Sequence, residues 1–232
     1  MRSMIENLFG NGQALMYGQA IISTLKVTLI SFSVSYLLGL PLGVLLYGTA
    51  SDGIFPNKPL SAVLDVIVNI IRSIPFIILL VMIQPLAKIV VGTKIGDNAF
   101  IFYLIVASFP YVARMIESSL REVDRGVIEA AQSMGSNNWQ IVTKVVIPEA
   151  KPSLIIGAAI AITTILGYTP MAYLIAGSGL LGQLAIQYGL YRFDSKIMYI
   201  SSLLLIILVQ LMQAVFTYFA KKTDKRNRGK CD

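Results

Sequence analysis

The sequence of 232 residues contains no histidine, and its single cysteine, Cys231, lies one residue before the last. Zinc sites, catalysis by cysteine and histidine, and a disulfide framework are therefore excluded within one chain. The phosphate-binding pattern G-x-x-x-x-G-K-[ST] is also missing, so we expect no Walker-type nucleotide site. Gly177, Gly179 and Gly182 match the dinucleotide pattern G-x-G-x-x-G, but they follow an apolar run rather than a strand. We interpret them as a flexible loop that lets two helices turn or gate.

Charged residues are also scarce, because they make up 13% of the chain whereas hydrophobic residues make up 56%. This composition cannot supply enough polar surface for a soluble globule of this size. The apolar runs do not alternate with polar residues, and each approaches the roughly 20 residues that cross about 30 Å of hydrocarbon. We therefore predict an all-α, polytopic membrane protein in which residues 1–232 form a single transmembrane domain.

The apolar runs predict five transmembrane helices, over residues 21–47, 61–85, 99–116, 153–176 and 197–220. Carboxylates are missing from the middle of these runs. Proton-coupled and sodium-coupled carriers usually need an ionisable or strongly coordinating group at that depth. Ion-driven transport is therefore disfavoured, and any pumping needs an outside energy source.

Basic residues indicate the orientation of the spans. With the N-terminus outside, twelve of the nineteen Lys and Arg residues lie in cytoplasmic segments and five lie in outer segments. The positive-inside rule therefore places the N-terminus outside and the basic tail, residues 221–232, in the cytoplasm. The net charge of +7 then requires no nucleic acid partner, because the tail contacts anionic membrane lipid.

Small residues recur at steps of three or four along the first predicted span. They are Thr24, Thr28, Ser31, Ser35, Gly39 and Gly43. This spacing places them on one face of a helix, where small side chains permit close helix packing. A weakly polar wall of a conduit would have the same spacing, and packing is our preferred interpretation.

Two places within the spans are candidates for a translocation pathway. Arg72 lies inside the second span, where a charge costs a few kcal/mol and should face protein, water or a partner group. Hydrogen bonds to helix carbonyls of another subunit explain it equally well. In the fourth span, residues 167–170 interrupt helical regularity, which is tolerated where the backbone is buried or lines a cavity. The candidate pathway residues are Arg72, Ser73, Pro75, Phe76, Thr163, Gly167, Tyr168 and Met171.

Residues 124–148 form a water-compatible segment between two apolar spans. Asp124 can cap a helix that runs to Met134, and Gly135 can end it in the left-handed conformation. Ser136 or Asn137 can begin a second helix, which Pro148 closes. The first helix is expected to lie across the cytoplasmic surface, with an apolar set available to a partner: Val127, Ile128, Ala131 and Met134. An amphipathic helix on lipid headgroups is the alternative. Glu129 and the small pair Ala130 and Ala131 weaken it, because they suit close contact with protein.

This segment resembles the signature loop of permease subunits of binding-protein-dependent ABC importers. The pattern is E-A-A, three residues, Gly, nine residues, an aliphatic residue, one residue, an aliphatic residue and Pro. It is matched by Glu129, Ala130, Ala131, Gly135, Val145, Ile147 and Pro148. Residues 68–80, 110–115 and 177–189 further resemble methionine importer permeases, and the resemblance covers nearly all of residues 14–220.

The resemblance implies a five-helix transport subunit that performs no chemistry itself. It implies a homodimer in the bacterial plasma membrane, two ABC ATPase subunits that bind ATP and Mg, and an extracytoplasmic binding protein that delivers L-methionine or D-methionine. The matched residues together with Met134 would form a coupling helix that contacts the ATPase and drives alternating access. The chain itself would hold no cofactor or metal. An importer of another amino acid or small organic solute is the first alternative, and a passive channel or membrane scaffold is a remote one.

Overall fold

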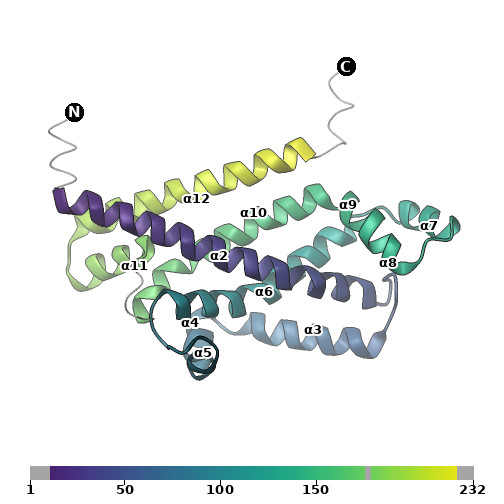
Figure 1. Ribbon diagram of the computed structural model, residues 1–232, viewed down its shortest axis with the longest axis horizontal. Helices are drawn as coiled ribbons and strands as arrows, with labels where there is room; N and C mark the ends of the chain where they lie inside the picture. The colour runs from purple at the N-terminus through teal and green to yellow at the C-terminus, as the bar shows by residue number, and fades with distance from the viewer. Residues whose placement is uncertain (1–10, 176–178, 224–232) are drawn as a thin grey trace, which may run out of the picture. The chain divides into compact units, whose positions relative to one another are not determined.

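The computed structural model describes residues 11–175 and 179–223, and Figure 1 shows them as a set of helices. Gly177 of the glycine-rich loop and residues 224–232 of the basic tail lie outside the described residues. Within the described ranges no strand occurs, and the predicted all-α fold class is confirmed.

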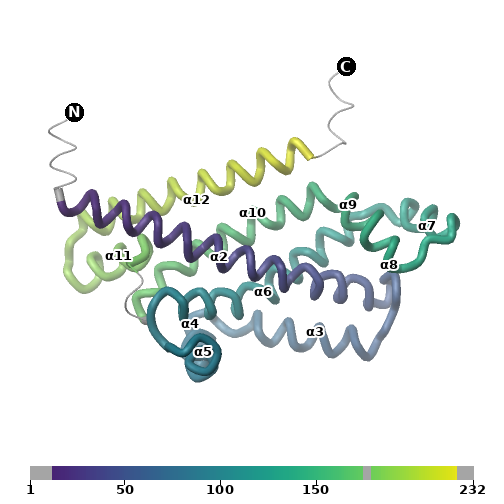
Figure 2. The backbone as a smooth tube through the Cα atoms, viewed as in Figure 1, coloured from purple at the N-terminus to yellow at the C-terminus, as the bar shows by residue number. Residues whose placement is uncertain are grey.

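The described elements follow one another without long irregular loops, apart from the turn at residues 50–57 (Figure 2). The elements labelled α are α-helices, η1 and η3 are π-helical, and η2 is a 3-10 helix. Their bounds are α2 (Asn11–Thr49), α3 (Lys58–Ser73), α4 (Phe76–Met82), α5 (Gln84–Val91), α6 (Asp97–Arg121), α7 (Arg125–Ser133), α8 (Asn138–Gln140), η1 (Ile141–Val146), α9 (Ile147–Glu149), α10 (Lys151–Gly167), η2 (Thr169–Ile175), α11 (Leu181–Ile186), η3 (Gln187–Tyr191) and α12 (Ser195–Thr223).

Four stretches among the described residues are long and apolar enough to cross a membrane: α2, α6, α10 with η2, and α12. The bent pair α3 and α4 gives a fifth crossing if it counts as one span. These five correspond to the five predicted runs. Proline interrupts neither α2 nor α6, although Pro41 and Pro110 lie inside them. Membrane helices tolerate proline because neighbouring groups satisfy the freed backbone carbonyls.

The second span differs from its prediction, because it is broken rather than continuous over residues 61–85. Helix α3 ends at Ser73, and Ile74 adopts an extended conformation with φ −81° and ψ 122°. Pro75 explains this, since its ring disfavours a helical conformation in the preceding residue and it has no N–H to donate. The third span is longer than predicted and continues to Arg121.

The chain forms two compact units, each built from several chain segments. The described residues of the first are 11–31, 77–104, 164–175 and 179–211. Its core includes Ala20, Leu181 and Leu184, and the backbone N–H of Leu181 donates to Thr24 Oγ1 over 3.0 Å. Gly182 permits a close approach in this unit, because a Cβ there would lie 2.5 Å from the backbone nitrogen of Pro170.

The second unit comprises residues 32–76, 105–163 and 212–223 of the described chain. Its largest core joins α2, α6, α7, η1 and α10, and it includes Tyr47, Leu120, Ala131 and Ile141. Here α2 and α6 pack closely, since a Cβ on Gly43 would lie 2.7 Å from the carbonyl oxygen of Ala113. The small-residue face of the first span therefore serves packing, as predicted.

Candidate functional site

Helix α7 begins after Asp124 and stops before Gly135, as the sequence predicts, although its last helical residue is Ser133 rather than Met134. The backbone N–H of Gly126 donates to Asp124 Oδ1 over 2.6 Å, which makes Asp124 the N-cap. Gly135 has a φ of +80°, and its N–H donates to the carbonyl of Gln132 over 2.9 Å. Ser136 N–H reaches back to the carbonyl of Ala131 over 3.1 Å. These bonds satisfy carbonyl groups that the end of a helix would otherwise leave without donors.

The second helix of the segment begins as predicted but does not end at Pro148. Asn137 and Gln140 form a reciprocal capping box, with hydrogen bonds of 2.8 and 3.0 Å. The chain then continues through the π-helical η1 into α9, where Pro148 occupies the first turn. The prediction that Pro148 closes the helix is therefore wrong. A proline is tolerated in a first turn because no N–H is required there.

The two faces of α7 have different surroundings. Glu129 and Ala130 are exposed, and Met134 has 78% of its surface exposed. Ala131, by contrast, is 2% exposed and belongs to the core of the second unit, with Ile128 packed against the same cluster. The expectation that Ala131 is available to a partner is therefore wrong, and Ala131 instead holds α7 to the core of the second unit.

The remaining residues of the matched pattern lie beyond α8. Val145 and Ile147 are partly buried and pack against the same core, whereas Pro148 is exposed. The structure therefore separates the matched residues into two sets. Glu129, Ala130, Met134, Gly135 and Pro148 lie at the surface, and Ala131, Val145 and Ile147 support them from within.

A cavity of about 350 Å³ lies beside α7. Glu129 and Gln132 of α7 line it, together with Tyr47 at the end of α2 and Asp52 in the following turn. Arg121 and Arg125 also line it. Helix α7 therefore borders both apolar packing and an open, charged space.

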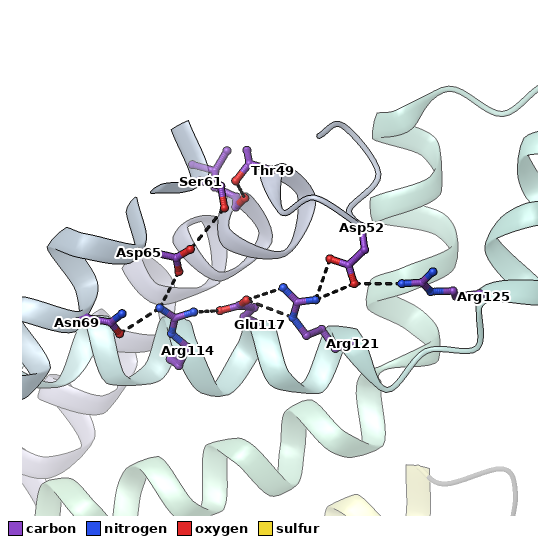
Figure 3. Close-up of polar contacts among 10 residues, drawn as sticks. Thr49, Asp52, Ser61, Asp65, Asn69, Arg114, Glu117, Arg121 and Arg125 are labelled. Atoms are coloured by element: carbon purple, nitrogen blue, oxygen red, sulfur yellow. Dashed lines mark hydrogen bonds and ion pairs between the residues drawn. The ribbon is translucent and has the colours of Figure 1, made fainter. Parts of the chain in front are cut away.

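Six charged residues of the second unit form a continuous series of ion pairs, which we call the charge chain: Asp65, Arg114, Glu117, Arg121, Asp52 and Arg125 (Figure 3). Its centre is Glu117 of α6, whose side chain is 7% exposed. Glu117 accepts from Arg114 over 2.7 Å and from Arg121 over 3.0 Å. Arg114 also donates to Asp65 of α3 over 2.8 Å.

The other end of the charge chain is Asp52, in the turn between α2 and α3. Arg121 donates to both of its carboxylate oxygens over 3.1 Å, and Arg125 donates to one of them over 3.0 Å. The hydrogen bond from Arg121 is the main reason that the pKa of Asp52 lies below its ordinary value. Asp52 is therefore ionised at neutral pH.

Sequence reasoning did not single out the charge chain. The spacing of Arg114, Glu117 and Arg121 places them on one helical face, so the sequence indicates that they can form ion pairs with one another. Their bonds to Asp52 and Asp65 bridge 69 and 49 residues, and no local pattern indicates them. Among the described residues, no three His, Cys, Asp or Glu side chains are grouped so as to hold a metal ion.

The candidate pathway residues fall into both units. In the second unit, Arg72 is exposed and its guanidinium lies 6.0 Å from the centre of the Tyr111 ring. Ser73 donates to the carbonyl of Asn69 over 2.7 Å, and Pro75 lies at the helix break. Phe76 is buried, and Thr163 donates to the carbonyl of Ile160 over 2.9 Å.

Gly167, Tyr168 and Met171 belong to the first unit. Gly167 ends α10, and the 3-10 helix η2 follows. The predicted interruption of the fourth span is therefore present. The pathway itself stays a prediction for all eight residues.

Known proteins are similar to this chain in sequence and in fold. The family described as binding-protein-dependent transport system inner membrane component matches residues 39–225. A probable D-methionine transport system permease of Vibrio cholerae is 43% identical over 203 residues, which are 88% of this chain and 90% of the relative. A methionine import system permease of Bacillus subtilis is 39% identical over 182 residues, covering 78% and 82% of the two chains.

A solved structure of the MetNI methionine ABC transporter in an inward-facing conformation contains a similar chain. It is 39% identical to this one, with a TM-score of 0.90. The match covers 93% of this chain and 100% of that one.

Proposed function

The chain belongs to the family of binding-protein-dependent transport system inner membrane components, and from this membership we propose that it is the transmembrane subunit of an ATP-driven methionine importer. The observation that carries the proposal is the similarity, over most of the chain, to permeases named for methionine transport in two bacteria and to a chain of a methionine transporter. No step of the transport is a chemical reaction on this chain.

In the proposed assembly two copies of this chain form a homodimer in the plasma membrane of a bacterium. Two ABC ATPase subunits bind ATP and Mg on the cytoplasmic side, and a binding protein delivers L-methionine or D-methionine from outside. Support for the ATPase contact comes from α7, which is a short capped helix with exposed Glu129, Ala130 and Met134. A surface of this kind suits docking into a groove.

Transport then proceeds by alternating access. ATP binding closes the two ATPase subunits, and the closure displaces α7. Because Ala131 and Ile128 pack into the core of the second unit, displacement of α7 carries neighbouring helices with it. The membrane path then opens alternately to the two sides.

Reconstitution tests the proposal. Vesicles that contain this chain with its ATPase and binding protein should accumulate methionine when ATP is supplied on the ATPase side, whereas this chain alone should neither bind nor hydrolyse ATP. A binding protein without cargo is the matched control. Uptake that persists without ATP would contradict the mechanism, and uptake of another amino acid in place of methionine would contradict the cargo.

A further inference from the structure

The joint between α6 and α7 is spanned by one carboxylate. Arg121 is the last residue of α6, and Arg125 is the first residue of α7. Between them, the N–H of Glu122 and the N–H of Val123 still donate to carbonyls of α6. Asp52 contacts both arginines from a distant part of the chain, over 3.1 and 3.0 Å. Figure 3 shows it between the two guanidinium groups. Asp52 therefore bridges the ends of α6 and α7 from outside both helices.

The link continues from the joint into the membrane helices. Arg121 bonds the buried Glu117, which bonds Arg114, and Arg114 bonds Asp65 and Asn69 of α3. The charge chain thus connects α7, the turn at residues 50–57, α6 and α3. It contains three carboxylates and three guanidinium groups, so it is neutral as a whole. A neutral set of paired charges is tolerated near the membrane far better than an unpaired one.

Helix α7 depends on this link because its apolar attachment is one-sided. Ile128 and Ala131 join it to the core, while the cavity lined by Asp52, Arg121 and Arg125 lies beside it. Apolar packing joins α7 to the core, but the hydrophobic effect is non-directional and does not by itself set the angle of α7. Hydrogen-bonded ion pairs, in contrast, fix distance and direction.

We propose that Asp52 is a positioning residue that locks α7 to the end of α6 and to the turn before α3. A displacement of α7 by the ATPase then moves α3 and α6 as one body instead of rotating α7 about its joint. This inference rests on the proposed importer function. It assigns to the α2–α3 turn a role in transmission that is separate from the ATPase contact itself.

The test is Asp52→Asn in vesicles that contain the complete transporter. Asparagine keeps the shape of the side chain but not its charge, so both arginine bonds weaken. We expect the number of ATP molecules hydrolysed per methionine imported to rise roughly fivefold, with assembly intact, because coupling changes of this size follow from losing such a link. Asp194→Asn is the control, since Asp194 accepts from two backbone N–H groups at the start of α12 and asparagine can do the same. An unchanged ratio in Asp52→Asn would overturn the inference.

A second variant pair separates transmission from folding. Asp52→Cys with Arg125→Cys, made in a Cys231→Ser background, removes the bond and allows a short thiol cross-linker to replace it. We expect the ratio to rise before cross-linking and to return to within about twofold of the parent after it. If the bond only stabilises the fold, its removal should lower ATP hydrolysis and methionine import together, and the ratio of the two should not respond to the cross-linker. That result would also refute the inference.

A cargo-independent readout distinguishes failure of this inference from failure of the proposed function. Lys58→Cys, at the exposed start of α3 and made in the Cys231→Ser background, should react with a maleimide at a rate that changes when ATP binds. That change should be lost in the Asp52→Asn background. If the parent complex imports no methionine, the proposed cargo fails, whereas an ATP-dependent labelling change that survives Asp52→Asn rejects the role of Asp52.

Discussion

At the scale of single residues, position 135 requires glycine because of its backbone conformation. Its φ of +80° lies in the left-handed region, and a Cβ at this position would have no atom within 4 Å. The cost of a side chain here is therefore conformational rather than steric. Non-glycine residues adopt this region at a cost of about 1 kcal/mol, and asparagine adopts it more easily than alanine.

Gly135→Ala should therefore loosen the end of α7 by about 1 kcal/mol and lower coupled uptake, while Gly135→Asn should have a smaller effect. Uptake in vesicles and co-purification with the ATPase measure the change. Gly18→Ala is the control, since Gly18 also has open space around it but no positive φ. Equal effects of alanine at both positions would contradict the conformational explanation.

Two neighbouring alanines of α7 should respond differently to the same charge. Ala131→Asp places a carboxylate in the apolar core, where an unpaired charge costs several kcal/mol, so the isolated permease should be less stable. Ala130→Asp should leave the permease stable, because Ala130 is exposed, but should weaken the proposed contact of α7 with the ATPase. Thermal unfolding of the permease in detergent and co-purification with the ATPase separate the two effects. A stable Ala131→Asp permease would contradict the packing of α7.

The pKa of Asp52 gives a prediction for acidic pH. Because its folded pKa is lowered, Asp52 contributes stability above its ordinary pKa, and this contribution is lost as the pH falls through the folded value. The pair is partly exposed, so the contribution should stay below about 1 kcal/mol. Between about pH 5 and pH 3 the parent should therefore lose more stability than Asp52→Asn, as measured by thermal unfolding. An equal loss of stability in the parent and in Asp52→Asn would contradict the ion pair between Asp52 and Arg121.

At the scale of elements, α2 and α6 pack through glycine. A Cβ on Gly39 would lie 2.8 Å from a side-chain carbon of Val112, and a Cβ on Gly43 would lie 2.7 Å from the backbone oxygen of Ala113. A backbone oxygen cannot move aside as the end of a flexible side chain can. The two helices can therefore approach this closely only because the face of α2 is free of side chains there.

Gly43→Ala should push α2 and α6 apart and destabilise the permease by roughly 1–3 kcal/mol, as overpacking does in other tight cores. Thermal unfolding in detergent measures the loss. The same change at Gly12, where nothing lies within 4 Å of the added atom, should be nearly neutral. A neutral Gly43→Ala would mean that the helices have room to shift.

At the scale of the whole molecule, the distribution of basic residues predicts the orientation in the membrane. Twelve of the nineteen lie in segments that one orientation places in the cytoplasm. A reporter that is active only outside should therefore work when fused before Met1 and fail when fused after Lys230. The reverse pattern would overturn the assignment of faces, including the cytoplasmic location of α7.

The sequence by itself determined the class of the molecule, the five apolar runs and both ends of α7. Each depends on local chemistry. A run of apolar residues is not stable in water, and Asp124 caps the backbone N–H two residues away. At position 135, glycine adopts the positive φ without strain. The break before Pro75 was also local, but hydropathy does not register it, and the second span was predicted as continuous.

The tertiary structure decided which face of α7 is buried and what holds it. The burial of Ala131 depends on its packing against α6 and η1. The position of Pro148 depends on the π-helical η1, which no sequence pattern predicted. The bond from Arg121 to Asp52 closes a loop of 69 residues. Such contacts form only when packing elsewhere brings distant segments together. The residues next to Asp52 in the sequence do not distinguish it from any other carboxylate in a turn.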